Sequence, residues 1–406
     1  MKYVMLVGDG MADYPLAELE GKTPLMVANT PNMDWVARNG SVGLVKTIPP
    51  GFPSGTEIAN MSLLGYDPVR YFTGRGPLEA ASMKISLEAD DVAFRCNLVS
   101  LSGFGSQVIM EDFTAGHIST EEARQIIQDI DGEMGTETIR FYPGLSYRHL
   151  MVWIGGGSRK GLESLPLVPP HDIVGKGISD YLPKVGGEDG IVELLTRSQI
   201  LLKEHPVNLA RMENGLKPAN SIWLWGQGRR PQIPTLVEKF GIEGSVICAV
   251  DLLKGLGLYA GLKVIDVPGA TGYLDTNYRG KAVYGLKELE EKDLVFIHVE
   301  APDEAGHSGD IPKKIEAIEA FDKEVVRTIL EGMREVRDYR VMVLPDHPTP
   351  IPLRTHVPDP VPFAIYDSRR KRSWPEGMSF DEDSVKGSGI SIENGYQIMD
   401  ILMRGD

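Results

Sequence analysis

Residues 293–307, DLVFIHVEAPDEAGH, constrain the fold more than any other stretch of this chain. The segment 294–299 is apolar and largely β-branched, which is typical of a strand buried on both faces. The run breaks at Pro302, and Asp303 and His307 follow four residues apart in the predicted turn. A buried strand that ends in a carboxylate and an imidazole predicts half of a metal site.

The other half of this site follows two further predicted strands. Residues 341–350, VMVLPDHPTP, contain an apolar strand that runs into Asp346 and His347. His356 follows in the segment THVPDPVPF, and the opening strand, KYVMLVGDG, delivers Asp9 at its carboxyl end. Because ligands of open parallel sheets bind beyond the carboxyl ends of the strands, three strands that each end in an acid predict one shared site.

The composition indicates a globular, cytoplasmic protein. The 406 residues suffice for two domains, and the apolar content of 42% is ordinary. Only Cys96 and Cys248 are present, too few for a disulfide framework, and no apolar run approaches the ~20 residues of a membrane span. The net charge of −15 argues against a nucleic-acid or anionic-membrane surface, so an anionic substrate must meet locally placed arginines.

The candidate ligands fit two divalent ions better than one. They are three carboxylates and three imidazoles: Asp9, Asp303, Asp346, His307, His347 and His356. This set is too large for one tetrahedral zinc, and its mixed ligation is compatible with Mn²⁺, Zn²⁺ or Co²⁺. Two-metal sites promote in-line displacement at phosphorus. Asp346 and His347 are adjacent, so they can share one ion only if the loop 345–348 is irregular.

A hydroxyl nucleophile is available near a Pro/Gly-rich turn. The segment PPGFPSGTEIANMSLLGYDP places Ser54 and Thr56 at the start of a helix predicted over residues 56–64. Free backbone N–H groups and the helix dipole favour an anion there, and a hydroxyl bound to a divalent ion loses its proton near neutral pH. We expect Thr56 to be the nucleophile and keep Ser54 as the reserve. The alternative is that either hydroxyl only caps the helix.

The pattern changes between residues 86 and 225. Several segments there have the alternation of half-buried strands, and Ser119 and Glu122 form a capping box before an amphipathic helix. This mixture predicts an α+β domain inserted into the first domain. We therefore expect an α/β fold with a central, mostly parallel sheet, made from residues 1–85 and 226–406 and interrupted by an insert over 86–225.

Several basic residues are candidates for binding an anionic substrate. Arg75 lies between two glycines, which allow close approach of a ligand. Arg229 and Arg230 precede a predicted helix, where two guanidinium groups can clamp a phosphate or carboxylate. A surface turn and a pair of solvated arginines are the respective alternatives. The insert adds candidates without a diagnostic spacing: His117, Arg140, Arg148, His171 and Asp172.

Seven motifs together resemble one known family. They are GDGMAD, GTEIANMSLLGYDP, GRGPLEA, PGATGYLDT, APDEAGH, PDHPTP and THVPDPVPF. Along almost its whole length the chain resembles the cofactor-independent phosphoglycerate mutases of the archaeal type, in the alkaline phosphatase superfamily. The resemblance implies an alkaline-phosphatase-like metalloenzyme domain with an inserted α+β substrate domain.

The resemblance also divides the candidate ligands between two ions. One ion would take Asp303, His307 and His356, and the other would take Asp9, Asp346, His347 and the nucleophile. The family's usual nucleophile is a serine, whereas counting back from GYDP puts Thr56 in this position. By the same resemblance, Arg229 and Arg230 would hold the substrate phosphate and His117 would transfer a proton.

We therefore expect interconversion of 3-phosphoglycerate and 2-phosphoglycerate through a phosphothreonine at Thr56. The expected cofactors are two divalent ions, Mn²⁺ first with Zn²⁺, Co²⁺ and Mg²⁺ as alternatives, and no 2,3-bisphosphoglycerate. Arg75, Arg148, Arg229 and Arg230 would hold this small phosphorylated carboxylic acid. No nucleic-acid or membrane partner is expected, and the sequence is compatible with a homo-oligomer.

Three alternatives stay open at this point. A homoserine kinase would need ATP, and the sequence has no G-x-x-x-x-G-K-[ST] loop, although this scaffold could take phosphate from a donor without one. A metal-dependent phosphomonoesterase or phosphonate-processing enzyme would release phosphate into water. A non-catalytic metal-binding scaffold would be insensitive to Thr56→Ala.

Overall fold

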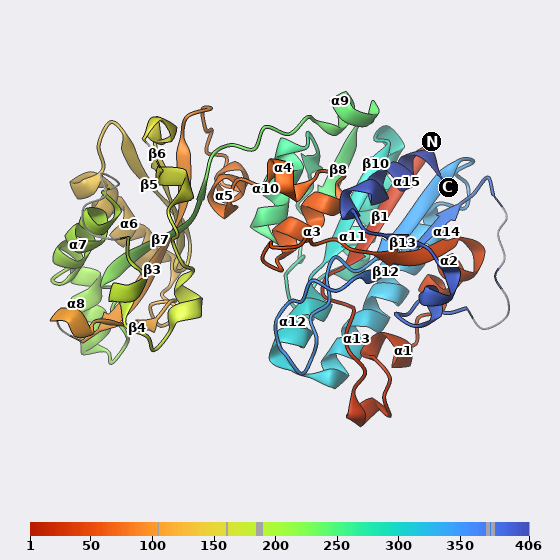
Figure 1. The fold of residues 1–406 in the computed structure, drawn as a ribbon, viewed down its shortest axis with the longest axis horizontal. Helices are drawn as coiled ribbons and strands as arrows, with labels where there is room; N and C mark the ends of the chain where they lie inside the picture. Colours follow the sequence, from red (N-terminus) through yellow and green to blue (C-terminus); the bar gives the residue numbers. More distant parts are fainter. Residues whose placement is uncertain (104, 160, 184–189, 371–373, 375–377, 406) are drawn as a thin grey trace. The chain divides into compact units, whose positions relative to one another are not determined.

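The computed structural model describes residues 1–103, 105–159, 161–183, 190–370, 374 and 378–405 (Figure 1). The chain forms two compact units, of which unit 1 comprises Met1–Phe72 with Gln232–Asp406 and unit 2 comprises Thr73–Pro231. These boundaries differ from the predicted division at 85/86 and 225/226. Helix α5 (Arg75–Ser82) belongs to unit 2 because it packs on strands β3 (Val92–Ser102) and β7 (Ser221–Gly228).

Unit 1 is built on a mostly parallel sheet, as predicted. The strand order is β13-β2-β12-β11-β1-β10-β8-β9, with β1 pairing in parallel with both β10 and β11. Only β12 runs antiparallel to its two neighbours, β11 and β2. The strands are β1 (Lys2–Gly8), β2 (Ser41–Val45), β8 (Gly244–Ile247), β9 (Lys263–Val264), β10 (Leu294–Val299), β11 (Tyr339–Leu344), β12 (Val361–Asp367) and β13 (Ser391–Ile392).

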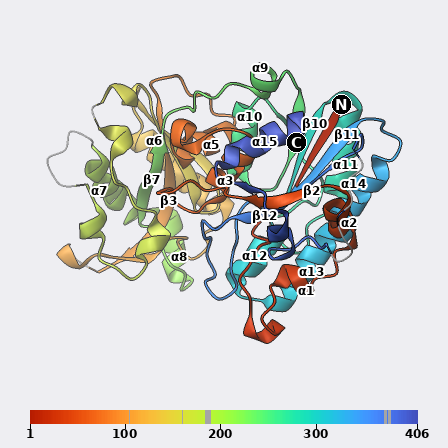
Figure 2. The same ribbon diagram turned by 45° about the vertical axis from the view of Figure 1, so that its right-hand side comes forward.

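Helices cover both faces of this sheet (Figure 2). Alternate residues of the central strands, such as Leu6, Ile297 and Val343, join a core with α2, α11 and α13, while α3, α10 and α15 lie on the other face. The helices of unit 1 are α1 (Pro24–Val27), α2 (Pro31–Asn39), α3 (Thr56–Leu63), α4 (Pro68–Tyr71), α9 (Leu236–Phe240), α10 (Asp251–Tyr259), α11 (Tyr278–Glu291), α12 (Ala301–Ser308), α13 (Ile311–Ala320), α14 (Arg327–Gly332) and α15 (Ile398–Arg404).

A π-helical turn interrupts the helical segment 311–332. Phe321–Val326 joins α13 to α14, and it places Asp322 at the start of α2. There the Asp322 carboxylate accepts the backbone N–H groups of Asn32 and Met33 at 3.1 and 2.7 Å. An acid at a helix N-terminus satisfies donors that have no intrahelical partner. The π turn thus fixes α2 on the helical layer beside the sheet.

Unit 2 contains a five-stranded sheet with helices packed against it. Its strands follow the order β4-β3-β6-β5, with β7 on β3. The predicted capping box is present, since Ser119 and Glu122 bond reciprocally at the start of α6. The remaining elements of unit 2 are β4 (Ile109–Asp112), β5 (Ile139–Leu145), β6 (Arg148–Trp153), α6 (Thr120–Met134), α7 (Ile191–Leu202) and α8 (Pro206–Glu213).

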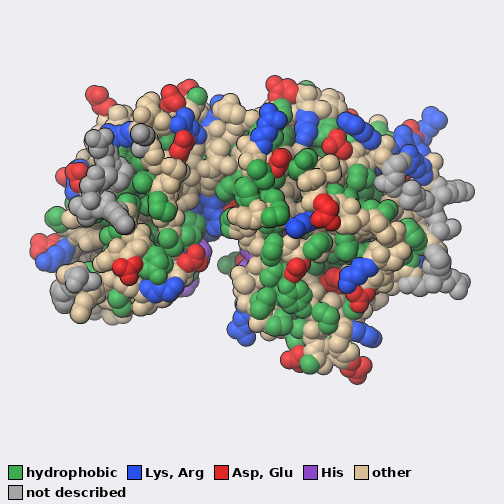
Figure 3. Space-filling model, in the orientation of Figure 1, with side chains coloured by type: hydrophobic (Ala, Val, Ile, Leu, Met, Phe, Trp, Pro, Cys, Tyr) green, Lys and Arg blue, Asp and Glu red, His purple; other side chains and the backbone are tan. Residues whose placement is uncertain are grey.

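Charged side chains of both signs are interspersed on the face of the molecule that Figure 3 shows. Within the described part of the chain, every helix is too short or too polar to span a lipid bilayer.

A half-buried glutamate connects the C-terminal part of unit 1 to its N-terminal loop. Glu382 accepts the backbone N–H of Asp13 at 3.0 Å and the hydroxyl of Thr23 at 2.7 Å. Burial raises the pKa of Glu382 to about 7, and these hydrogen bonds only partly offset the effect. Because the folded pKa lies above the ordinary value, the contribution of Glu382 to stability is complete below about pH 4.5 and is lost as the pH rises through about 7.

Glu382→Gln should remove this pH dependence. An uncharged amide carries no desolvation penalty at alkaline pH, so the variant should gain up to about 3 kcal/mol relative to the parent between pH 5 and pH 8. Urea unfolding curves at the two pH values measure this difference. An equal effect of the substitution at both pH values would contradict the assignment.

Candidate metal centre

Three adjacent strands place their acids at one edge of the unit 1 sheet. Asp9 directly follows β1, Asp346 lies two residues beyond β11, and Asp303 lies in α12, which begins just after β10. The order β11-β1-β10 makes these strands neighbours, so the predicted shared site is formed within unit 1. Gly10 allows the close approach, because its φ is +60° and a Cβ there would lie 2.8 Å from the Cα of Asp303.

Asp303, His307 and His356 form the first group of ligand atoms. His307 Nε2 lies 3.2 Å from Asp303 Oδ2, and His356 Nε2 lies 3.3 Å from Asp303 Oδ1. Asp303 and His307 were predicted in a turn but lie on the helix α12, where a spacing of four residues puts both on one face. The Nδ1 atoms of His307 and His356 lie 3.0 Å from the carbonyl oxygens of Arg354 and Ser54.

Asp9, Asp346, His347 and Thr56 form the second group. His347 Nε2 lies 3.5 Å from Asp9 Oδ1, 3.8 Å from Asp346 Oδ2 and 3.3 Å from Thr56 Oγ1. The chain bends at Asp346 and His347, which is the irregular loop that the adjacent pair requires. Thr56 is the first residue of α3, and its hydroxyl faces this group.

His347 lies between the two groups and connects them. Its ring centroid is 4.0 Å from that of His356, and its ligand atom also groups with Asp303 and His356 within 4.8 Å. The division of His307 and His347 between two ions therefore stays a prediction. The six predicted ligands and Thr56 nevertheless lie in one continuous centre.

The donor set fits divalent cations. A carbonyl oxygen only accepts, so His307 and His356 each donate from Nδ1, and in their neutral forms their Nε2 lone pairs lie 2.9 Å apart beside Asp303. Asp9 Oδ1 is buried and has no hydrogen-bond partner among the residues that the structure describes. Lone pairs and carboxylate oxygens facing one another repel unless a cation lies among them. The described residues thus supply the oxygen and nitrogen ligands that divalent metal ions bind.

The pKa values of the ligands reflect this arrangement. Burial raises the pKa of Asp9, and the charges of Asp346 and Asp303 raise it further. Burial alone would raise the pKa of Asp303, but His307 and His356 hold it well below the ordinary value. Burial lowers the pKa of His347 to about 4. The imidazole of His347 is therefore neutral at pH 7 and presents a lone pair to a metal ion.

Comparison with known proteins identifies the family. The profile described as "2,3-bisphosphoglycerate-independent phosphoglycerate mutase" matches residues 37–208. The chain is 52% identical over 408 residues to the mutase of that name from Methanosarcina acetivorans, with all of both chains covered. It is 50% identical over 404 residues to a probable mutase of the same name from Geobacter sulfurreducens, covering 99% of this chain and 100% of the relative.

The chain belongs to the 2,3-bisphosphoglycerate-independent phosphoglycerate mutases. These metal-dependent isomerases are the family that the seven sequence motifs predicted. A solved structure of the cofactor-independent phosphoglycerate mutase from Thermoplasma acidophilum is 28% identical, with a TM-score of 0.66 over 100% of this chain and 99% of that one. A Pyrococcus horikoshii protein of solved structure is 29% identical, with a TM-score of 0.82 over 99% and 96%.

Sequence reasoning missed a polar layer beneath these mutase ligands. His298 of β10 is fully buried, and its Nε2 forms a possible ligand group with Asp9 and Asp346. Asn60, one turn after Thr56 on α3, donates from Nδ2 to Asp346 Oδ2 at 2.8 Å. The signal was present, because a histidine inside the apolar run LVFIHV must find a polar partner within the protein.

The predicted substrate residues of the mutase all lie in unit 2. Arg229 is paired with Asp90 at 3.3 Å and Glu163 at 2.5 Å, which favours a structural role in that unit. Arg148 and Arg230 are exposed, and Arg148 lies over the Tyr147 ring. His117 is exposed at a turn and has a φ of +51°. The substrate and proton-transfer roles of these residues stay predictions.

Unit 2 also gathers an aromatic and basic cluster that the sequence did not define. The guanidinium groups of Arg75 and Arg95 lie 5.6 and 4.3 Å from the Trp225 ring centroid. His171 packs edge-on against the same ring at 5.5 Å. Of the predicted candidates, this cluster contains Arg75 and His171. Arg95 of this cluster also forms an ion pair with Glu79 at 2.9 Å.

Thr349→Val should weaken metal binding without unfolding the protein. The buried Thr349 hydroxyl donates to Asp303 Oδ1 and lies 3.3 Å from His347 Nδ1, so it orients one proposed ligand from each group. Loss of such a partner costs about 10–100-fold in metal affinity, and the isosteric side chain preserves packing. Calorimetric titration of metal-depleted protein with Mn²⁺ measures this loss. Thr235→Val, at the start of α9, is the matched control, and equal affinities of both variants would refute the role of Thr349.

Proposed function

We propose that the chain interconverts 3-phosphoglycerate and 2-phosphoglycerate by way of a phosphate carried on Thr56. One observation carries the proposal: the Thr56 hydroxyl lies 3.3 Å from His347 Nε2 and faces a centre of three buried carboxylates and three imidazoles. The relatives' names supply the reaction. A covalent intermediate replaces one difficult displacement by two easier ones.

Thr56 fits the role of nucleophile better than Ser54. The contact that Ser54 makes with the centre is through its backbone carbonyl, which accepts from His356 Nδ1 at 3.0 Å. The Thr56 side chain itself faces the ligands, and Asn60 Nδ2 holds the Thr56 carbonyl at 2.9 Å. The position of Ser54 thus suits a residue that orients a histidine.

The start of α3 prepares a site for a phosphoryl group. Thr56 is the first residue of the helix and Gly55 its N-cap, so the hydroxyl lies among the backbone N–H groups at the positive end of the helix dipole. Such groups and the helix dipole favour an anion beside the hydroxyl. Divalent ions, when bound, supply Lewis acidity that lowers the pKa of a hydroxyl and balances the phosphoryl charge.

We infer two ions, with Mn²⁺ as the preferred one. The two ligand groups of unit 1 each combine carboxylate oxygens with imidazole nitrogen, which suits Mn²⁺, Zn²⁺ and Co²⁺. Mg²⁺ prefers oxygen ligands and water, so it should bind this nitrogen-rich centre more weakly. In this scheme Asp303, His307 and His356 hold one ion, and Asp9, Asp346, His347 and Thr56 hold the other.

The alternatives predict different products. A homoserine kinase and a phosphomonoesterase could use the same ligand set, but the names of the relatives do not favour either. A phosphomonoesterase would transfer the phosphate from Thr56 to water rather than to the glycerate. The fate of the phosphate therefore separates the mutase from its rivals.

An enolase-coupled assay of Mn²⁺-loaded protein with 3-phosphoglycerate should give product without free phosphate. Thr56→Ala should lower kcat by at least about 10³-fold, because removal of a nucleophile abolishes the covalent route. Thr56→Ser is the matched control, since it keeps a hydroxyl, and it should stay within about 10-fold of the parent. Full activity of Thr56→Ala, or phosphate release as the main reaction, would refute the proposal.

A further inference from the structure

A chain of buried charged groups lies directly beneath the second ligand group. Lys281 of α11 and His298 of β10 have no exposed surface, and Glu300 is 3% exposed. Lys281 Nζ donates to Glu300 Oε2 at 2.6 Å and to the His298 carbonyl oxygen at 2.9 Å. The backbone N–H of Ala249 donates to Glu300 Oε1 at 2.6 Å. The Glu300 carboxylate is therefore held in one orientation from two sides.

The two ring nitrogens of His298 connect this chain to the centre. Nδ1 lies 3.3 Å from Glu300 Oε1, which is an ion-pair distance without the geometry of a hydrogen bond. On the opposite side of the ring, Nε2 lies 3.3 Å from Asp346 Oδ2 and 3.6 Å from Asp9 Oδ2. Proteins often orient the groups of a metal site with an imidazole that has a carboxylate on its other side. His298, with Glu300 on one side and Asp346 on the other, has this arrangement.

Asp346 is held on both of its oxygens. Oδ1 accepts the backbone N–H groups of Gly10 at 3.2 Å and His347 at 2.9 Å. Oδ2 accepts Asn60 Nδ2 at 2.8 Å and faces His298 Nε2. The backbone donors and Asn60 belong to the loops and the helix that form the centre. Among these donors, His298 is the one that also contacts Glu300, which in turn pairs with Lys281.

Stability by itself does not account for the buried Lys281–Glu300 pair. Removing two charges from water costs several kcal/mol for each, and apolar residues of similar volume often replace such a pair with little loss. The pair supports a single histidine that touches two proposed metal ligands. Its position thus suggests a role in the geometry of the centre.

We propose that Lys281, Glu300 and His298 are positioning residues for the second ion. Lys281 fixes Glu300, the Glu300 carboxylate attracts the His298 ring at Nδ1 as an ion pair, and His298 Nε2 donates to Asp346 so that this carboxylate keeps the orientation in which it binds metal. None of the three touches the substrate in this account. The inference rests on the proposed two-ion centre and adds a layer that the ligand list does not contain.

Mn²⁺ titration of the metal-depleted full chain tests this role. His298→Leu should weaken one class of Mn²⁺ site by about 10–100-fold and leave the other unchanged. His298→Gln should bind within about 3-fold of the parent, because its amide nitrogen can reach the place of Nε2 and donate to Asp346. Unchanged affinity in His298→Leu would overturn the proposal. Equal loss in both variants would also overturn the proposal. That result would mean that His298 binds the metal ion directly, a role that the donating amide of Gln does not restore.

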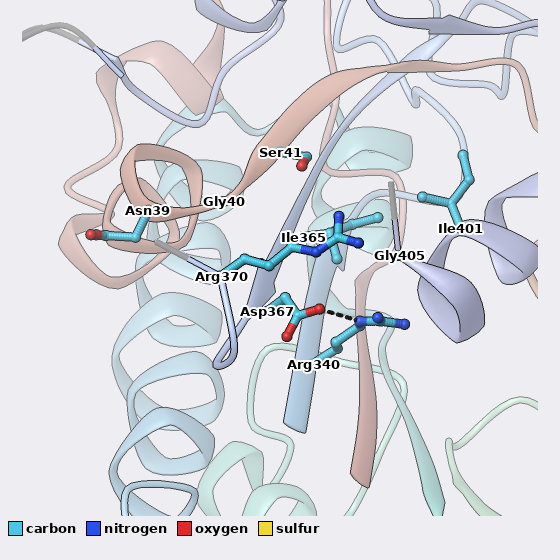
Figure 4. A pocket seen from close by; sticks show the side chains of 9 residues that line it. All are labelled: Asn39, Gly40, Ser41, Arg340, Ile365, Asp367, Arg370, Ile401 and Gly405. Atoms are coloured by element: carbon cyan, nitrogen blue, oxygen red, sulfur yellow. Dashed lines mark hydrogen bonds and ion pairs between the residues drawn. The ribbon is translucent and has the colours of Figure 1, made fainter. Parts of the chain in front are cut away.

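A double variant keeps the test valid if the single variants fold poorly. Lys281→Met/Glu300→Leu replaces the ion pair by apolar groups, so it should remain folded and show the same selective loss of one Mn²⁺ site. The control is Arg340→Met/Asp367→Leu, which removes another buried pair, 2.8 Å apart, at the start of β11 and in β12 (Figure 4). The control should bind Mn²⁺ like the parent. Equal behaviour of the two double variants would overturn the proposal.

The Mn²⁺ titration and the mutase assay distinguish an error in the positioning role from an error in the proposed function. If the parent protein shows mutase activity while every His298 variant binds Mn²⁺ normally, the positioning role is wrong and the function stands. If the variants lose one Mn²⁺ site while the parent lacks mutase activity, the positioning role stands and the function is wrong.

Discussion

Repulsion among three buried carboxylates is the constraint on which unit 1 depends. Asp9, Asp303 and Asp346 lie at the ends of adjacent parallel strands, and each is at most 7% exposed. Ionised carboxylates at this depth destabilise a fold unless cations or donors compensate them. Three imidazoles, a hydroxyl, an amide and backbone N–H groups compensate part of this charge. Divalent ions would compensate the remaining negative charge, so metal binding would contribute to the folding free energy of the unit.

Hydrogen bonds fix the orientation of the side chains that surround the centre. His307 and His356 each use one nitrogen for a backbone carbonyl, which turns the other nitrogen toward Asp303. Two buried lysines lie behind the ligands: Lys281 pairs with Glu300, and Lys314 pairs with Asp13 and donates to the Thr349 carbonyl at 2.8 Å. A centre whose ligands are fixed in this way needs little rearrangement when ions and a phosphoryl group enter it.

The strand-end acids could be predicted from the sequence because each follows an apolar run, and parallel strands bring such ends together. The change of pattern between residues 86 and 225 predicted an insert, and counting back from GYDP put Thr56 before Ser54 as the candidate nucleophile. Periodicity could not show that Asp303 and His307 lie on a helix, because the segment APDEAGHS is too short to display a helical pattern. The role of His298 could not be predicted, because the sequence does not show which group a single polar residue in a buried strand will contact. Pairing of Arg229 with Asp90 and Glu163 depends on tertiary contacts that are 139 and 66 residues away in sequence.

The most direct measurement is the detection of the phosphorylated residue during turnover. Mn²⁺-loaded protein mixed with 3-phosphoglycerate would be quenched in acid within milliseconds, digested and analysed by mass spectrometry. The account predicts a phosphate on Thr56, present during turnover and absent without substrate. Phosphate on Ser54, or on no residue while product forms, would contradict the assignment of Thr56 as the carrier.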